Sequence, residues 1–253
     1  MRQYELINKI IEILVDNQYI HYAFLKGSFA CGKEDNYSNV DIYLKLKIDK
    51  EEDFFENYVY ILESYRPILF LKAKEFKEIR IIYDDNINLN LYLIDDLKRL
   101  NIKHSIVKLY DPDNLLEDIY DYSLMLSDEE IANVVDEISL ACYDFHRLYL
   151  RNEYTAIMHV VSKIHELYSI ILHYYYSKED SKLGIKKIFT NMDVEGRKRY
   201  IAILKEWKLD SVKNCVLMML DDVFNIVCGF NINIANHMNF DFFNDMKKKI
   251  TLL

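Results

Sequence analysis

The chain has 253 residues, and 51% of them are hydrophobic, which is enough for one large or two modest domains with their own cores. It contains 5 glycines and 2 prolines against 21 tyrosines and 13 phenylalanines, a balance that favours long regular elements over elaborate loops. The formal net charge of −9 argues against a general polyanion-binding protein, because Lys and Arg side chains that neutralise phosphates supply most non-specific affinity for nucleic acids.

Cysteine spacing and the apolar runs limit the class of protein further. The four cysteines are scattered with no Cys-x-x-Cys pair, so neither a zinc site nor a disulfide framework is indicated. The N-terminus lacks the basic-then-apolar pattern of a signal peptide, and no apolar run approaches the ~18 residues of a membrane span. We therefore expect a cytoplasmic protein that does not bind membranes.

The chain opens with a helix and two strands. Apolar residues recur at helical spacing over 5–15, which predicts an amphipathic helix, and the pattern then predicts a strand over 20–26. A tight turn is expected at 27–28. Apolar and polar residues alternate strictly over 39–46, which predicts a second strand with one apolar and one polar face.

A helix and a hairpin follow. Residues 50–65 have helical spacing, and an extended stretch is expected over 68–71. Two strand patterns, 79–83 and 87–93, flank the sequence Asp-Asp-Asn at 84–86, a composition typical of a hairpin turn.

The polar faces of two of these strands carry the residues that matter below. Because successive side chains of a strand point to opposite faces, we expect Asn39 and Asp41 to point the same way. On the second hairpin strand, Asn88, Asn90 and Tyr92 share one polar face.

The remainder of the chain has a helical pattern. Apolar residues recur every three or four positions over 131–148 and again over 153–176. Ser127 supplies an N-cap, with Glu130 at the third helical position, which is the pattern of a capping box. We therefore predict two domains, a mixed α/β domain over 1–115 and a helical bundle over 116–253.

The segment over 24–46 resembles the signature of the polymerase-beta-type nucleotidyltransferase superfamily: a strand, a Gly-Ser turn, about ten residues, then an acid position, a hydrophobic residue and an acid. Within it, the segment is most similar to the lincosamide nucleotidyltransferases and related antibiotic nucleotidyltransferases. The matching residues are Gly27, Ser28, Phe29, Gly32, Asp35, Tyr37, Ser38, Asp41 and Tyr43.

This resemblance implies an α+β fold and an activity. The N-terminal domain would hold a mixed β-sheet flanked by helices, and the C-terminal bundle would help to form the acceptor pocket or a dimer interface. The reaction would be AMP transfer from ATP, with Mg²⁺, to a hydroxyl of a small antibiotic-like molecule such as a lincosamide or an aminoglycoside, as in antibiotic resistance.

The resemblance also assigns roles to residues. Gly27 and Ser28 would contact the triphosphate, Asp41 and Asn39 occupy the two metal-ligand positions, and Asn90 occupies the position of the third carboxylate, which serves as the base. Lys26 and Arg151 are further candidates for contacts to the nucleotide, Arg151 because Arg-Asn-Glu-Tyr resembles a helix segment of the family. For both residues, a solvated charge is the favoured interpretation.

Two of the three carboxylate positions therefore carry amides. Mg²⁺ relies on carboxylates and substrate phosphates, so with Asp41 alone we expect the ion to be bound weakly or lost. An amide cannot accept a proton near neutral pH, which removes ~10²–10⁴ in rate if Asn90 occupies the base position. Four other acids could substitute if the backbone places them suitably, namely Glu34, Asp35, Asp84 and Asp85.

Histidine chemistry is the weaker alternative. Four histidines fall on predicted helices, but no two have the His-x-x-x-His spacing of a metal site, and a core or surface role explains them better. They are His146, His159, His165 and His173.

Two hypotheses follow. The first is an adenylyltransferase acting on a small-molecule acceptor. The second is a catalytically silent module that binds a nucleotide, another ligand or a protein partner in the manner of an antitoxin, and it predicts ATP binding that is nearly independent of Mg²⁺. The sequence leaves the acceptor open, and also whether the chain forms a homodimer.

Overall fold

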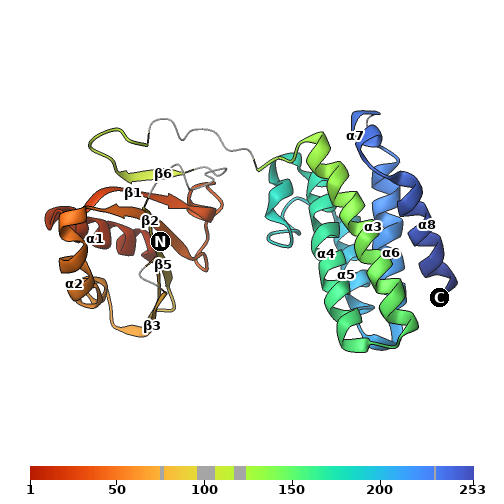
Figure 1. Ribbon diagram of the computed structural model, residues 1–253, viewed down its shortest axis with the longest axis horizontal. Helices are drawn as coiled ribbons and strands as arrows, with labels where there is room; N and C mark the ends of the chain where they lie inside the picture. Colours follow the sequence, from red (N-terminus) through yellow and green to blue (C-terminus); the bar gives the residue numbers. More distant parts are fainter. Residues whose placement is uncertain (75–76, 96–105, 117–123, 231) are drawn as a thin grey trace. The chain divides into compact units, whose positions relative to one another are not determined.

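The computed structural model describes residues 1–74, 77–95, 106–116, 124–230 and 232–253. The chain divides into two compact units, Met1–Ser123 and Leu124–Leu253, which are drawn in Figure 1. The described part of the first unit holds a six-stranded sheet with two α-helices, and the second unit is helical. The predicted α+β class with a C-terminal helical region is confirmed.

The sheet of the first unit is mixed. Its strand order is β3-β4-β5-β2-β1-β6, in which β2 and β5 run parallel and every other neighbouring pair is antiparallel. The strands are β1 (Ile20–Lys26), β2 (Val40–Leu46), β3 (Ile68–Lys74), β4 (Glu78–Tyr83), β5 (Asn88–Leu93) and β6 (Val107–Tyr110).

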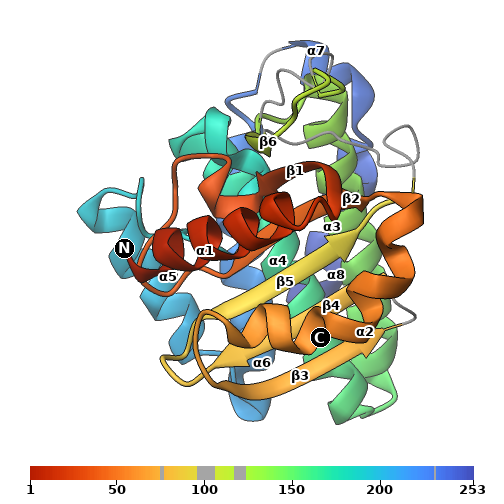
Figure 2. The same cartoon turned by 90° about the vertical axis from the view of Figure 1, so that its left-hand side faces the viewer.

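Both helices of the first unit, α1 (Arg2–Asp16) and α2 (Glu51–Glu63), lie over one face of this sheet (Figure 2). Their apolar faces form one core with the inward side chains of the strands, including Val40, Ile42 and Leu44, which are fully buried. The sequence analysis expected a mixed sheet flanked by helices. In the described residues the helices cover one face, so the polar alternation of β2 and β5 faces away from them.

The segment after the hairpin strands contributes to the other face. Leu116 is fully buried in a small apolar cluster with Tyr22, Phe24 and Ile94, which lies apart from the main core. This contact explains why the first unit continues past residue 115, where we placed the boundary. The short strand β6, which pairs with β1, was not predicted.

The second unit is built on long packed helices. Helices α3 (Asp128–Leu150) and α4 (Tyr154–Tyr176) contact each other, α6 (Val212–Val227) contacts α4, and α8 (Phe240–Leu252) contacts both α3 and α6. The shorter helices α5 (Val194–Lys205) and α7 (Ile232–His237) contact α6 and α3, respectively. Together these helices enclose one hydrophobic core.

The predicted capping box begins α3. The Ser127 hydroxyl accepts a hydrogen bond from the Glu130 N–H at 3.1 Å, and the Ser127 N–H donates to Glu130 Oε2 at 2.9 Å. These two bonds satisfy two backbone donors at the helix start.

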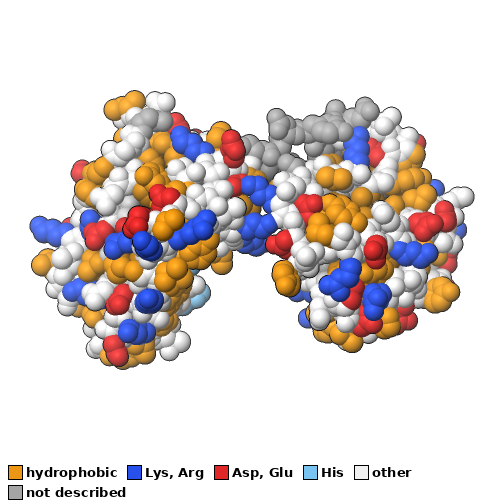
Figure 3. Space-filling model, turned by 180° about the vertical axis from the view of Figure 1, so that it is seen from behind, with side chains coloured by type: hydrophobic (Ala, Val, Ile, Leu, Met, Phe, Trp, Pro, Cys, Tyr) orange, Lys and Arg blue, Asp and Glu red, His pale blue; other side chains and the backbone are white. Residues whose placement is uncertain are grey.

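The surface is mixed in charge. Over the described residues seen in Figure 3, basic and acidic side chains are interspersed on both units. Among the described helices, none combines the length and the apolar character that crossing a bilayer requires.

Candidate functional site

Four polar residues form a row across the face of the sheet that lies opposite α1 and α2 (Figure 2), which we call the open face only in the sense that neither of these helices covers it. The strand registers pair Arg80 on β4 with Asn90 on β5, Asn90 with Asp41 on β2, and Asp41 with Lys26 on β1. Arg80 Nε donates to Asn90 Oδ1 at 3.2 Å, and Asn90 Nδ2 donates to Asp41 Oδ1 at 2.7 Å. We call these four residues the polar row.

The polar row exists because β2 and β5 are parallel neighbours in register. Adjacent strands are ~4.8 Å apart, so residues directly opposite each other on one face are within hydrogen-bonding reach. Asn90 is 5% exposed, and both ends of its amide have a partner in the row. The predicted proximity of Asp41 and Asn90 is therefore present in the structure.

Gly27 joins this row through a close backbone approach. It follows Lys26 directly, has a φ of +69°, and a Cβ added to it would lie 2.9 Å from Asp41 Oδ2. Glycine is required here for two reasons: the left-handed backbone conformation is strained for other residues, and an added Cβ would lie too close to the Asp41 carboxylate. The half-buried Ser28 follows, and its carbonyl accepts the Lys33 N–H at 2.9 Å, which closes the turn.

A second row runs beside the first, one pleat further along the strands. The registers pair Glu78 with Tyr92, Tyr92 with Tyr43, and Tyr43 with Phe24. The rings of Tyr43 and Tyr92 are stacked with centroids 4.4 Å apart, and those of Tyr43 and Phe24 with centroids 5.5 Å apart. Burial, with the nearby Tyr92, Asp41 and Glu78, raises the pKa of Tyr43 to about 12, so its hydroxyl remains a neutral donor.

Four charged side chains meet at the polar row. Lys26 and Arg80 are cations, Asp41 is the carboxylate of the row itself, and Glu78 forms an ion pair with Arg80, so two positive and two negative charges stand together when all four are ionised. Partial burial lowers the pKa of Lys26 below its ordinary value, while the nearby Asp41 acts in the opposite direction. Lys26 Nζ lies 4.9 Å from the centre of the Tyr43 ring, and Arg80 also contacts Glu78 Oε1 at 3.2 Å.

These residues do not fit a Mg²⁺ ion. In the described residues there is no group of three His, Cys, Asp or Glu side chains that could hold a metal. At the polar row, one Asp41 oxygen is already bonded to Asn90, and the two cations oppose a divalent ion. The row thus lacks both the charge and the ligand number that the resemblance implies.

Asn39 lies just outside strand β2. It is exposed and precedes the start of β2 at Val40 by one residue. That its side chain points the same way as Asp41 stays a prediction.

Arg151 lies outside the first unit, and its predicted helical position is wrong. It ends α3, and Asn152 has a φ of +56°, so Arg-Asn-Glu forms the turn between α3 and α4. Arg151 contacts Glu153 at 3.8 Å, with 59% and 49% of their side chains exposed. This exposure and pairing match the solvated-charge interpretation.

The four substitute acids have other partners. The hydroxyl of Tyr4 donates to Glu34 at 2.7 Å, while Asp35 accepts the Tyr37 N–H and the Ser38 hydroxyl. At the hairpin, Arg66 Nε donates to Asp84 at 2.6 Å, and the Tyr65 hydroxyl donates to Asp85 at 3.0 Å. These contacts hold the turns of the first unit, and the structure gives none of the four acids a contact with Asp41.

Sequence reasoning missed Arg80, Glu78 and the state of Asn88. Arg80 and Glu78 are two residues apart on β4, so their side chains lie on the same face of the sheet. Which residues of β5 they face can be inferred only once the hairpin register is known. The Oδ1 atom of Asn88 is buried and has no hydrogen-bond partner among the described residues. It is on the same strand face as Asn90, so one acceptor beside the polar row is unused.

The second unit has a polar network of its own. Asp222 accepts hydrogen bonds from the Tyr168 hydroxyl at 2.8 Å and from Arg199 Nε at 3.0 Å, which links α4, α5 and α6 beside a pocket. Burial and the Asp222 charge raise the pKa of Tyr168. Each polar group has a partner, so the network acts as a cross-link between helices.

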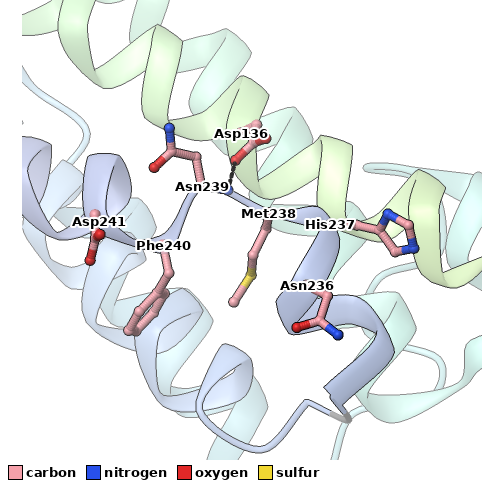
Figure 4. A pocket seen from close by; sticks show the side chains of 7 residues that line it. All are labelled: Asp136, Asn236, His237, Met238, Asn239, Phe240 and Asp241. Carbon is pink, nitrogen blue, oxygen red and sulfur yellow. Dashed lines mark hydrogen bonds between the residues drawn. The ribbon is translucent and has the colours of Figure 1, made fainter.

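Another pocket of this unit lies where α7 meets α8 (Figure 4). The N–H of Asn239 donates to Asp136 Oδ1 at 2.8 Å, which ties the start of α8 to α3. His237 lines this pocket together with Asp136 and Asp241, and both acids lie to the same side of it in Figure 4; no metal-ligand group is assembled among the described residues.

No protein-family model matches the chain, and no curated protein matches it. Among solved structures, an aminoglycoside 6-adenyltransferase from Bacillus subtilis is similar over 100% of this chain and 99% of that chain. The identity is 11% and the TM-score is 0.34, and at these values we draw no function from the match.

Proposed function

We propose that the first unit is a nucleotidyltransferase-like module that binds a nucleotide at the Gly27-Ser28 turn without transferring it. The observation that carries this proposal is the position of Asp41, bonded to Asn90 and packed against Gly27 at the end of β1. This is the geometry that the resemblance in the sequence implies, with amides in place of acids. The proposal rests on the residues themselves, since fold alone does not confer chemistry.

The same geometry argues against turnover. A general base must accept a proton from the acceptor hydroxyl, and Asn90 has an amide whose oxygen already accepts from Arg80 and whose nitrogen donates to Asp41. The loss of a base and of a metal together removes the two main means of phosphoryl-transfer catalysis.

AMP transfer from ATP to a hydroxyl of a lincosamide or an aminoglycoside is the second candidate. The position of Asp41 favours this second candidate, because Asp41 is the one of the three carboxylate positions that carries an acid, and it lies beside Gly27 at the turn. The double change Asn39→Asp with Asn90→Glu tests how much of the machinery is present, and a gain of transfer would show that only the carboxylates are missing.

Both candidates are tested in one experiment. The full chain is titrated calorimetrically with ATP and with GTP, and it is then incubated with ATP, Mg²⁺ or Mn²⁺ and an antibiotic panel, with the acceptor masses read by mass spectrometry. The binding module predicts heat of nucleotide binding and no mass shift. An AMP adduct on any acceptor would establish transfer, and the lack of heat with either nucleotide would refute the binding module.

A further inference from the structure

We infer that Lys26 and Arg80 act as fixed cations in place of the metal, so that the open face binds a phosphate chain in its metal-free form. This inference rests on the proposed function and specifies the form of the ligand that the site takes. Its basis is the polar row and the disagreement between that row and a Mg²⁺ site.

Both cationic groups lean toward the centre of the sheet. Lys26 starts from β1, yet its ammonium lies over the ring of Tyr43 on β2. Arg80 starts from β4, yet its guanidinium reaches Asn90 on β5. Lys26 and Arg80 belong to β1 and β4, with β2 and β5 between them, and both side chains reach inward from these two strands, so a phosphate chain lying across β2 and β5 would meet both cations.

The two side chains are held in place and remain accessible. Asn90 Oδ1 and Glu78 Oε1 fix the guanidinium of Arg80 from two sides, while 52% of its side chain is exposed. A positioned guanidinium suits phosphate oxygens, since its donors lie in a planar fork. The partial burial that lowers the pKa of Lys26 also means that an anion placed beside it would be poorly screened by water.

The amide of Asn90 leaves Arg80 with Glu78 as its one acidic partner among the described residues. A carboxylate at this position would form an ion pair with Arg80 and would repel Asp41, which is hydrogen-bonded to the same side chain. The amide fills the same place without either effect. The exchange of acid for amide therefore removes one negative charge from the row while it keeps the register.

Variants that change the charge of the polar row distinguish phosphate binding by fixed cations from phosphate binding through a metal ion. The change Asp41→Asn removes the carboxylate of the row and raises the summed charge of Lys26, Arg80, Asp41 and Glu78 from zero to one positive charge. With fixed cations, the affinity for a metal-free phosphate chain should rise; with a metal site, binding should be lost. The change Arg80→Gln should weaken binding by ~10-fold or more, the usual effect of removing a charged hydrogen-bond donor.

The matched control is Arg66→Gln. Arg66 is also on the first unit and is similarly exposed, at 47% of its side chain, but its partners are Asp84 and Asp85 at the hairpin. Its loss removes the same charge from the unit without touching the row, so binding should remain within about twofold of the wild type.

The experiment titrates the full chain and these three variants with ATP and with inorganic tripolyphosphate, once in EDTA and once in excess Mg²⁺. We expect the wild type to bind in EDTA at least as strongly as in Mg²⁺. The affinity in EDTA should increase for Asp41→Asn and decrease for Arg80→Gln, and it should stay unchanged for the control Arg66→Gln. Binding that requires Mg²⁺, or that Asp41→Asn abolishes, would overturn the inference while nucleotide binding stands. Tripolyphosphate binding without ATP binding would refute the nucleotide module and leave the inference intact. If neither ligand binds, both fail.

Discussion

The change Gly27→Ala tests the contact on which the candidate site depends. It adds a Cβ 2.9 Å from Asp41 Oδ2 at a residue with a φ of +69°. Two costs are expected. The left-handed backbone costs an L-residue ~1–2 kcal/mol, and the carboxylate must shift, which weakens its 2.7 Å hydrogen bond from Asn90.

Gly32→Ala isolates the second of these costs. Gly32 has a φ of +63°, and nothing lies within 4 Å of an added Cβ. The backbone strain is therefore common to both variants. A hydrogen bond to a charged group contributes ~1.5–3 kcal/mol, and Asp41 is partly solvated, so we expect Gly27→Ala to destabilise the first unit by ~1–3 kcal/mol more than Gly32→Ala.

The stability of the first unit is measured by hydrogen exchange at the amides of β2 and β5, whose slowest members report the opening of the whole unit. Fluorescence would be misleading, because the single tryptophan, Trp207, lies in the second unit. A double-mutant cycle with Asp41→Ala completes the test. In that background the extra cost of Gly27→Ala should vanish, since the atom that it approaches is gone.

Equal costs for the two glycine variants would refute the close approach. A coupling energy between positions 27 and 41 of less than ~0.5 kcal/mol would also refute it, because mutations at independent sites have additive effects within that range.

Three further predictions concern the second unit. Gly196→Ala places a Cβ into the Tyr176 ring, so it should lower the midpoint of urea unfolding by an amount equivalent to ~1–3 kcal/mol, and Tyr176→Ala should relieve this cost. Ser127→Ala should lose ~1 kcal/mol, measured in the same way, because a helix N-cap is removed; an unchanged midpoint would show that the cap is dispensable. Burial lowers the pKa of His165, so the unfolded chain takes up a proton that the folded unit does not, and stability should fall as the pH drops below ~6.5. Fluorescence of Trp207, whose ring is 4.7 Å from that of His165, follows this transition, and His165→Gln should reduce its pH slope.

Local patterns predicted most elements of the first unit because each is encoded over a few consecutive residues. Strand β1 has the predicted bounds, 20–26, and the hairpin strands differ from their predicted starts by one residue each. Strand β6 was missed because four residues carry too little alternation, and its partner β1 lies far away in the chain. The turn at Arg151 falls in the break between the two predicted helical patterns, 131–148 and 153–176, and only the resemblance placed Arg151 within a helix segment.

The candidate site was only half predictable for a related reason. A sequence shows that Asp41 and Asn90 lie on polar strand faces, but it does not show which strands are neighbours. Once β5 lies between β2 and β4, the register brings Arg80 to Asn90, and Lys26 comes to Asp41 from the other side. Lys26 alone had been at least as well explained as a solvated charge.

The polar row can be understood as a linked set of replacements. Asn90 donates to Asp41 through its nitrogen and accepts from Arg80 through its oxygen, which an acid at the same position could not do while ionised. An acid there would pair with Arg80 and repel Asp41, so Arg80 and an acid at position 90 would neutralise each other. With the amide, the register of the row is kept and one negative charge fewer stands beside Asp41. Register and charge are thus set by different residues, and the opposite responses expected of Asp41→Asn and Arg80→Gln follow from that separation.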